Sequence, residues 1–376
     1  MRRGPSAGRG AGRHEPPGES RVSVQRPIRV LVVDDSPTMA NMLTALLTEE
    51  PRIEVVGRAG DGNRAVQLAR LLRPDVITMD LLLPGLDGPG AIAAIMSQSP
   101  ARILVVSAVA EQRGVDLGFQ AMSAGALELI GKPNVTNAEE LRRWGKELAH
   151  SVCLMAEVPV ISRRPRAATA PPPPTGARVD IFGVVASTGG PPALADVLSK
   201  LPRSLPVPLL IAQHITVGFT QGMVRWLSQV TPLPVSIAKD GERLEPGRVY
   251  FPLDGHDLLV DAAGLARLQP SQGGPCPSGD VMLTSLAAAF GRRSGGVVLT
   301  GMGEDGARGL LAIRRAGGVT FSQDEASSVV FGMPRAALDV KATDQGVPLA
   351  SMPELILQSC TFAPFRGGRP EGGPTR

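Results

Sequence analysis

Short apolar runs that each end in polar residues recur along the chain, and segments with helical spacing separate them. The run at 28–33 is followed by Asp34 and Asp35, and the run at 206–213 is followed by His214. Near-continuous apolar strands that alternate with helices are typical of parallel sheets covered by helices on both faces. Ligands of such folds bind beyond the carboxyl ends of the strands. The polar residues at these strand ends are therefore the first candidates for a functional site.

Segments rich in proline, glycine and arginine divide the 376 residues into two parts. The segment at 151–178 contains four consecutive prolines, which favour an extended, solvated chain. We expect a linker there, a disordered basic tail at 1–27 and a second disordered tail at 363–376. The remaining segments, 28–150 and 179–362, are each close to the length of one domain, about 150 residues.

Composition and charge exclude several classes of protein. The first 27 residues hold six Arg and two Glu, so they account for the whole net charge of +4. That tail has no aromatic residue for base stacking, and the second domain has no basic recognition helix, so no nucleic-acid partner is expected. The three cysteines are far apart and form no CxxC pair, which argues against a disulfide framework or a zinc site.

No targeting or membrane segment stands out. The longest apolar stretches are interrupted by glycine and proline, and none approaches the roughly 20 residues of a bilayer span. The basic start of the chain has no apolar core behind it, as a signal peptide would. We therefore expect a cytoplasmic protein that is not inserted in a membrane.

Acidic, hydroxyl and ammonium side chains stand at the ends of successive strands predicted within 28–150. They are Asp34, Asp35, Asp80, Ser107 and Lys132. In a parallel sheet these groups converge on one edge, where clustered carboxylates suit a hard cation such as Mg²⁺. A carboxylate beside Mg²⁺ can act as a nucleophile on phosphorus. Any one acid at a strand end could instead be an ordinary helix N-cap, but that alternative does not explain the whole set.

The stretches IRVLVVDDSPTM, PDVITMDLLLPGLDG, ILVVSA and GALELIGKP resemble the receiver domain of response regulators. The resemblance covers about 28–150 and implies a doubly wound (βα)5 fold. It also implies a phosphoprotein of a two-component phosphorelay, with Asp80 as the phosphoacceptor. Leu129 departs from the family, which usually has an aromatic residue three positions before the lysine.

The same resemblance assigns the other residues at this edge. Asp34 and Asp35 would bind Mg²⁺ together with Asp80. Ser107 and Lys132 would sense the phosphoryl group.

Three strand ends of the second domain offer a hydroxyl, an imidazole and a carboxylate. Ser187 follows a strand and precedes a glycine turn and a helix, much as in a nucleophile elbow. His214 follows the next strand, and Asp305 follows the strand GGVVLTG. A serine hydroxyl becomes nucleophilic when a base takes its proton, and the imidazole needs an acceptor that holds its tautomer. Each residue alone could be a helix cap or a strand-end polar residue, and spacing alone leaves open whether the three meet.

A competing motif overlaps Asp305. Residues 301–306 match GxGxxG between a strand and a helix, and Asp324 and Glu325 follow about 20 residues later, where a ribose-binding acid stands in dinucleotide sites. However, Glu304 and Asp305 lie inside the loop, and their charges would repel a pyrophosphate.

The stretches GVVASTGGPPAL, IAQHITVGFT and VVLTGMGEDGARGLLAIRRAGGVTFSQDEASSVVFGMPRAAL resemble the catalytic domain of the chemotaxis protein-glutamate methylesterase/glutamine deamidase (CheB) family. A receiver, a linker and this domain are the family's architecture. Over about 179–350 the resemblance implies a doubly wound, mainly parallel α/β methylesterase domain that needs no cofactor. It implies methyl-accepting chemotaxis receptors as substrates, a chemotaxis histidine kinase as phosphodonor, and action at receptor arrays.

The resemblance also implies residue roles. Ser187 would be the nucleophile, His214 the general base and then acid, and Asp305 the group that orients it. The backbone amide of Met302 would lie in the oxyanion hole. The reaction implied is hydrolysis of γ-glutamyl methyl esters with release of methanol, and deamidation of glutamines by the same acyl-enzyme route.

The order of the two domains also predicts how the enzyme is regulated. We expect the unphosphorylated receiver to pack against the catalytic face and block it, and phosphorylation of Asp80 to rearrange that interface. A phosphorylation-controlled binding module would have a catalytically dead second domain, against which the presence of Ser187, His214 and Asp305 argues. A DNA-binding output would require salt-dependent affinity for DNA.

Overall fold

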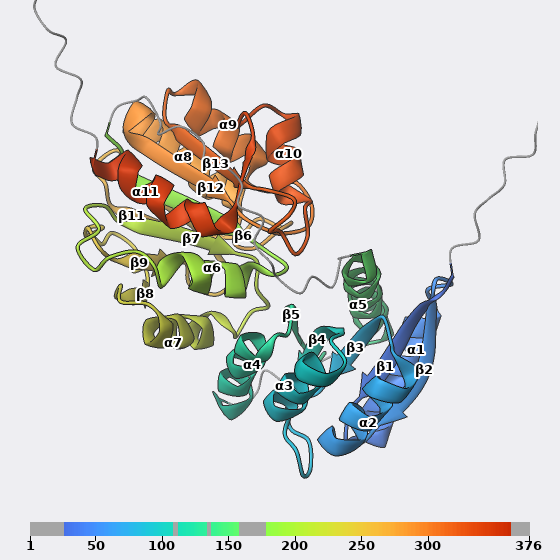
Figure 1. The fold of residues 1–376 in the computed structure, drawn as a ribbon. Coiled ribbons are helices and arrows are strands. Elements are labelled where there is room, and N and C mark those ends of the chain that lie inside the picture. Colours follow the sequence, from blue (N-terminus) through green and yellow to red (C-terminus); the bar gives the residue numbers. More distant parts are fainter. Residues whose placement is uncertain (1–25, 108–111, 134–136, 158–177, 362–376) are drawn as a thin grey trace, which may run out of the picture.

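Two α/β units follow one another along the chain (Figure 1). The computed structural model describes residues 26–107, 112–133, 137–157 and 178–361. Nearly all of the tails predicted at 1–27 and 363–376, and most of the linker predicted at 151–178, lie outside these residues. Within the described part of the chain, no helix is both long and apolar enough to cross a bilayer.

The first unit is a five-stranded parallel sheet in the order β2-β1-β3-β4-β5 with helices on both faces. The doubly wound fold predicted for this unit is confirmed. Its strands are β1 (Ile28–Val33), β2 (Ile53–Ala59), β3 (Val76–Met79), β4 (Arg102–Ser107) and β5 (Glu128–Gly131). Its helices are α1 (Pro37–Thr48), α2 (Gly62–Leu72), α3 (Gly88–Gln98), α4 (Gln112–Ala124) and α5 (Ala138–Glu157).

Helix α5 runs past the domain end predicted at residue 150. Its apolar residues continue at helical spacing, so that Leu148, Val152 and Met155 are all fully buried. Residues 151–157 therefore belong to this helix and not to a linker. The proline-rich stretch that motivated the linker begins only after the helix ends.

The second unit is built on a seven-stranded sheet in the order β14-β13-β12-β6-β7-β9-β8, whose recorded strand pairs are all parallel. A separate antiparallel hairpin, β10-β11, packs beside it. The mainly parallel sheet predicted here is confirmed, whereas the hairpin and the strands β13 and β14 had not been predicted.

The strands are β6 (Ile181–Ala186), β7 (Leu209–Gln213), β8 (Val235–Ile237), β9 (Val249–Phe251), β10 (His256–Val260), β11 (Ala266–Pro270), β12 (Ser294–Val298), β13 (Val319–Gln323) and β14 (Gly346–Val347). The α-helices are α6 (Gly190–Leu198), α7 (Thr220–Val230), α8 (Gly279–Phe290), α9 (Ala307–Arg315), α10 (Met333–Asp339) and α11 (Met352–Thr361). Short 3₁₀ helices span Gly291–Arg293 and Leu349–Ser351.

Strand β6 lies in the middle of this sheet and is buried along its whole length. The chain continues from β6 to β7 on one side, and returns much later to place β12 on the other side. Such a reversal of strand order opens a crevice at the carboxyl ends of the strands. The segments that follow β6, β7 and β12 therefore meet at this point.

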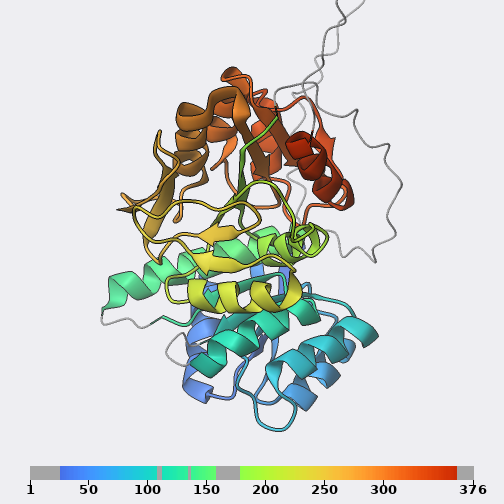
Figure 2. The same cartoon turned by 90° about the vertical axis from the view of Figure 1, so that its left-hand side faces the viewer.

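The two units touch where α4 of the first packs against α6 and α7 of the second, and where β5 meets the turn before α6. Figure 2 shows the two units one above the other. The rings of Phe119 and Trp226 stack with centroids 5.5 Å apart. Trp226 also donates a 3.0 Å hydrogen bond from its indole nitrogen to the hydroxyl of Ser123. Phe119 is only 1% exposed and belongs to the apolar core of the second unit, so the interface is tightly packed.

Candidate active site and phosphorylation site

Ser187 occupies the turn between β6 and α6. Its amide donates to the carbonyl of Thr300 at 3.0 Å, and its own carbonyl accepts from the amide of Gly190 at 2.7 Å. The N-cap of α6 is Gly189, at φ +74°, and no side chain caps this helix. A Cβ at Gly189 would lie 2.5 Å from Cβ of Val329, so both the turn and the packing require glycine. Ser187 is therefore not the helix cap that it could have been.

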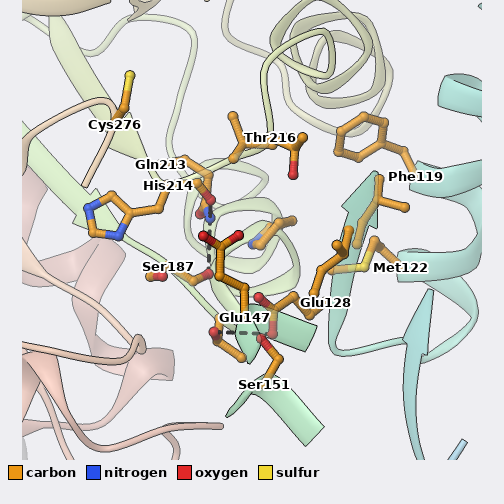
Figure 3. A pocket seen from close by; sticks show the side chains of 15 residues that line it. Phe119, Met122, Glu128, Glu147, Ser151, Ser187, Gln213, His214, Thr216 and Cys276 are labelled. Atoms are coloured by element: carbon orange, nitrogen blue, oxygen red, sulfur yellow. Dashed lines mark hydrogen bonds between the residues drawn. The ribbon is translucent and has the colours of Figure 1, made fainter. Parts of the chain in front are cut away.

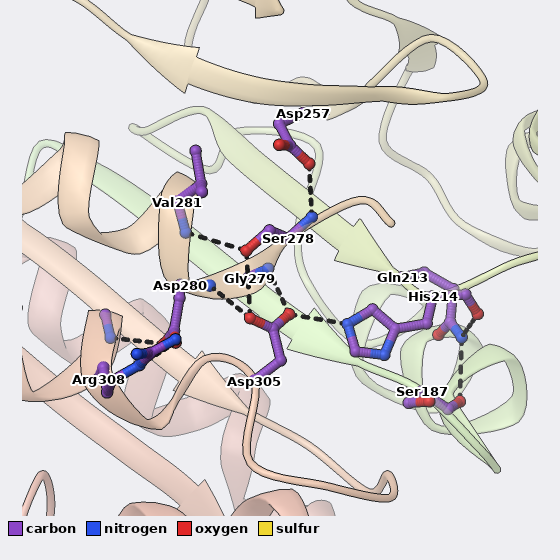
Figure 4. Close-up of polar contacts among 11 residues, drawn as sticks. Ser187, Gln213, His214, Asp257, Ser278, Gly279, Asp280, Val281, Asp305 and Arg308 are labelled. Atoms are coloured by element: carbon purple, nitrogen blue, oxygen red, sulfur yellow. Dashed lines mark hydrogen bonds and ion pairs between the residues drawn. The ribbon is translucent and has the colours of Figure 1, made fainter. Parts of the chain in front are cut away.

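His214 follows β7, and its amide donates to the carbonyl of Ala186 at 3.0 Å. Its Nε2 lies 2.8 Å from Oδ2 of Asp305. Because an ionised carboxylate can only accept, Nε2 carries the hydrogen and Nδ1 is left as the basic nitrogen. Figure 4 shows the imidazole between Asp305 and Ser187. The structure thus brings together the three residues that spacing alone could not connect.

The carboxylate of Asp305 is held by the N-terminus of α8. The amides of Gly279 and Asp280 donate to it at 2.6 and 3.0 Å, and the hydroxyl of Ser278 donates at 3.2 Å (Figure 4). Burial acts to raise the pKa of Asp305, but the hydrogen bonds from His214 and from the two amides outweigh burial and lower it. The helix dipole favours the same ionised form. These contacts favour the ionised form of Asp305, which accepts a hydrogen bond from Nε2 of His214.

Two features of this site had not been predicted from the sequence. The buried amide of Gln213 donates from Nε2 to the carbonyls of Ser187 and His214, at 3.0 and 2.9 Å. It thus connects the two strand ends that carry the hydroxyl and the imidazole. The other feature is the N-terminus of α8 beside Asp305. A serine at this position could have predicted the helix start, because Ser278 is the N-cap and its hydroxyl accepts from the amide of Val281.

The loop that holds Met302 packs against Ser187. The carbonyl of Gly301 accepts from the amides of Gly332 and Met333 at 3.1 and 2.9 Å. A Cβ at Gly301 would lie 2.7 Å from Cβ of Ser187, so only glycine permits this approach. The role of the Met302 amide in an oxyanion hole stays a prediction.

Two further polar residues of the second unit have separate environments. His256 lies on β10, and its Nδ1 is 2.9 Å from the carbonyl of Asp254. Asp324 accepts from the amide of Ser327 at 3.1 Å. The carboxylate of Asp305 is buried and occupied by contacts with an imidazole and with the N-terminus of α8, which leaves its negative charge inside the loop where a pyrophosphate would have to bind.

The predicted acidic edge forms at the carboxyl ends of β1 and β3. The ammonium of Lys132 lies 2.8 Å from Oδ2 of Asp34 and 2.7 Å from Oδ2 of Asp80. Burial raises the pKa of Asp34 despite the neighbouring ammonium. Burial acts to lower the pKa of Lys132, but its hydrogen bonds to Asp34 and Asp80 raise it overall.

These residues fit a divalent cation. Asp34, Asp35 and Asp80 each offer a carboxylate oxygen, and these oxygens lie within 4.8 Å of one another. The receiver thus has an acidic triad consistent with a Mg²⁺ site. The hydroxyl of Ser107, at the end of the adjacent strand β4, is buried and makes no hydrogen bond within the described residues. It remains available for an incoming group.

A cavity of about 280 Å³ lies between the two units, beside Ser187 and His214. The receiver lines it with residues of α4, β5 and α5, among them Met122, Glu128 and Glu147 (Figure 3). The candidate active site is therefore covered by the receiver on one side.

The fold and the two sites define a class of protein: a hydrolase-type α/β domain with a serine, histidine and aspartate at its switch point, joined to a receiver domain. Family models agree with both halves. The response regulator receiver domain matches residues 30–143, and the CheB methylesterase model matches residues 182–356.

Curated relatives match almost from end to end. A protein-glutamate methylesterase/protein-glutamine glutaminase of Anaeromyxobacter dehalogenans is 43% identical over 88% of this chain and 96% of its own length. One from Myxococcus xanthus is 40% identical over 91% of this chain and 98% of its own length. The crystal structure of the Thermotoga maritima CheB methylesterase catalytic domain has 30% identity, covers 48% of this chain and 99% of that chain, and has a TM-score of 0.46. This chain belongs to the family of protein-glutamate methylesterases/protein-glutamine glutaminases with a receiver domain.

Proposed function

We propose that this chain hydrolyses γ-glutamyl methyl esters on methyl-accepting chemotaxis receptors, releases methanol and deamidates receptor glutamines, with Ser187 as nucleophile. One observation carries the assignment of residues: the 2.8 Å contact between His214 and Asp305, beside Ser187 at the switch point of the sheet. Membership of the family supplies the substrate class.

The chemistry has two steps. Nδ1 of His214 takes the proton of Ser187 as Oγ attacks the ester or amide carbonyl, and the protonated imidazole then gives that proton to the leaving oxygen or nitrogen, so that methanol or ammonia departs. A water, deprotonated by the same nitrogen, hydrolyses the acyl-enzyme and restores the hydroxyl. Asp305 stabilises the imidazolium in both steps, and the amide of Met302 would donate to the oxyanion.

The receiver would control this chemistry through Asp80, which accepts a phosphoryl group from a chemotaxis histidine kinase. The carboxylates of Asp34, Asp35 and Asp80 would hold Mg²⁺, which when bound would supply neutralisation of the charge on the transferring phosphoryl group. The ammonium of Lys132 lies beside Asp80 and would pair with the phosphoryl oxygens, and Ser107 would donate to them. Phosphorylation would thus redirect the contacts of Lys132.

We also propose that the unphosphorylated receiver blocks the active site. The cavity beside Ser187 is lined from both units, and α4 and β5 pack against the catalytic unit (Figure 3). Phosphorylation at Asp80 would rearrange this interface and admit the receptor. We place the protein in the cytoplasm, at receptor arrays, with no nucleic-acid partner.

The proposal is tested by methanol release from methylated receptor membranes, with and without a small-molecule phosphodonor and Mg²⁺. Release should rise at least about tenfold with the donor, and Asp80→Asn should lose this response but keep the basal rate, because amide nitrogen cannot accept the phosphoryl group. The exposed Asp87→Asn serves as the matched control. Absence of release from receptors known to be methylated, under either condition, would favour a binding module instead.

A change at the interface should raise the basal rate. Phe119→Ala removes the stack with Trp226, so we expect about tenfold faster methanol release without phosphodonor and little change with it. Leu71→Ala, at a 75% exposed position on α2, is the control. If Phe119→Ala keeps the wild-type basal rate and wild-type stability, the interface does not restrain the enzyme.

A further inference from the structure

Two hydrogen-bond donors immediately follow the nucleophile, and both are bonded to the receiver. The hydroxyl of Thr188 donates to Oε2 of Glu128 at 3.3 Å, and the amide of Gly189 donates to the carbonyl of Leu127 at 3.1 Å. Adjacent residues at the start of β5 thus pair with adjacent residues of the catalytic turn. No other backbone hydrogen bond between the two units is recorded among the described residues.

These donors lie where a substrate must pass. Thr188 is 7% exposed with the receiver in place, and it lines the same cavity as Ser187 and His214. A donor so close to a buried site costs stability if it is left without an acceptor. When the receiver departs, acceptor atoms of the arriving receptor segment can replace Leu127 and Glu128.

The receiver residue at this contact resembles the product of the proposed reaction. Glu128 has the side chain that the reaction produces, a free glutamate, and Figure 3 shows it directed toward the catalytic unit. Its recorded hydrogen bond is the one that it accepts from the hydroxyl of Thr188. The other titratable groups that line the cavity are Glu147 of α5, His214 after β7, and Cys276. None of the described side chains of α4, and none in the turn that contains Thr188, is charged.

We propose that the Thr188 hydroxyl and the Gly189 amide form a subsite for acceptor atoms of the receptor segment, and that Leu127 and Glu128 occupy this subsite in the docked state. This inference rests on the proposed function. The receptor segment and the receiver would then compete for the same two donors, the Thr188 hydroxyl and the Gly189 amide.

The competition between the receiver and the receptor segment for this subsite would depend on pH. Burial raises the pKa of Glu128 to about 7, against a smaller lowering by Thr188, whereas the carboxyl of an undocked, hydrated receiver has an ordinary pKa. The docked state therefore favours the neutral acid. Docking is strongest below the ordinary glutamate pKa, weakens as the pH rises toward about 7, and changes little above it.

Thr188→Val tests the subsite, because it keeps the shape of the side chain and removes the donor. In full-length protein treated with phosphodonor, we expect the KM for methylated receptors to rise about fivefold with kcat nearly unchanged. Thr188→Ser should restore the wild-type KM, which a purely steric role would not predict. An unchanged KM for Thr188→Val would overturn the subsite.

Glu128→Gln tests the receiver's part, because glutamine keeps the acceptor and cannot ionise. The readout is the ratio of unstimulated to phosphodonor-stimulated methanol release between pH 5.5 and 8, which cancels the pH dependence of the catalytic residues. In the wild type this ratio should rise with pH, by up to about tenfold per unit below the pKa of Glu128. In Glu128→Gln the ratio should stay low and flat, while the exposed Glu139→Gln should follow the wild type.

The outcomes separate the two proposals. If the stimulated wild type releases no methanol, the proposed function fails. If it does, but Glu128→Gln follows the wild-type pH profile, Glu128 does not occupy the subsite, and this inference fails while the function stands.

Discussion

Ser187→Ala is expected to lower methanol release from methylated receptors about 10⁶-fold, leaving a residual rate about 10³–10⁴-fold above the uncatalysed reaction, because the oxyanion hole and substrate binding remain. The reason is that alanine has no hydroxyl, so neither attack on the carbonyl nor the acyl-enzyme can form at position 187. The measurement is kcat in full-length protein with phosphodonor and Mg²⁺, and deamidation should fall in parallel because both reactions use the same acyl-enzyme.

The matched control is Ser199→Ala, an exposed serine at the other end of α6, which should retain full activity. Phosphorylation of Asp80 and the thermal unfolding temperature should be unchanged in both variants. Substantial esterase activity in properly folded Ser187→Ala would remove Ser187 as the nucleophile.

Asp305→Asn is expected to lower kcat about 10⁴-fold, because an asparagine amide can present an N–H to Nε2 of His214. The imidazole would then carry its hydrogen on Nδ1, the nitrogen that must accept the proton of Ser187. The same substitution reduces the charge facing the amides of Gly279 and Asp280, so the free energy of unfolding should fall by about 1–3 kcal/mol.

Asp280→Asn separates the two effects. Asp280 accepts from Arg308 and from the amide of Gly309, both at 2.8 Å, but its carboxylate has no recorded contact with His214. We expect a comparable loss of stability and less than about a tenfold loss of kcat. Equal losses of kcat in the two variants would mean that Asp305 acts on the fold of α8 and not on the imidazole.

The local pattern of the chain was sufficient to predict the class of fold and to place the candidate site residues at strand ends. Apolar runs followed by polar residues predicted parallel strands, and they placed Ser187, His214 and Asp305 at strand ends. The receiver acids followed from the same rule. This works because side-chain burial in a strand and the turn after it depend mostly on neighbouring residues.

Only the tertiary structure decided which nitrogen of His214 meets Asp305, and that α8 presents its N-terminus to that carboxylate. These contacts join residues 91 and 26 positions apart in the chain. The pairing of Glu128 with Thr188, 60 positions apart, also depends on how two separately folded units dock. A sequence pattern indicates which face of a helix or strand is buried. The hydrogen-bond partner of a polar side chain, in contrast, depends on packing between elements. The sequence alone therefore determined the chemistry available in this protein, and packing between distant elements decided how those groups are oriented and covered.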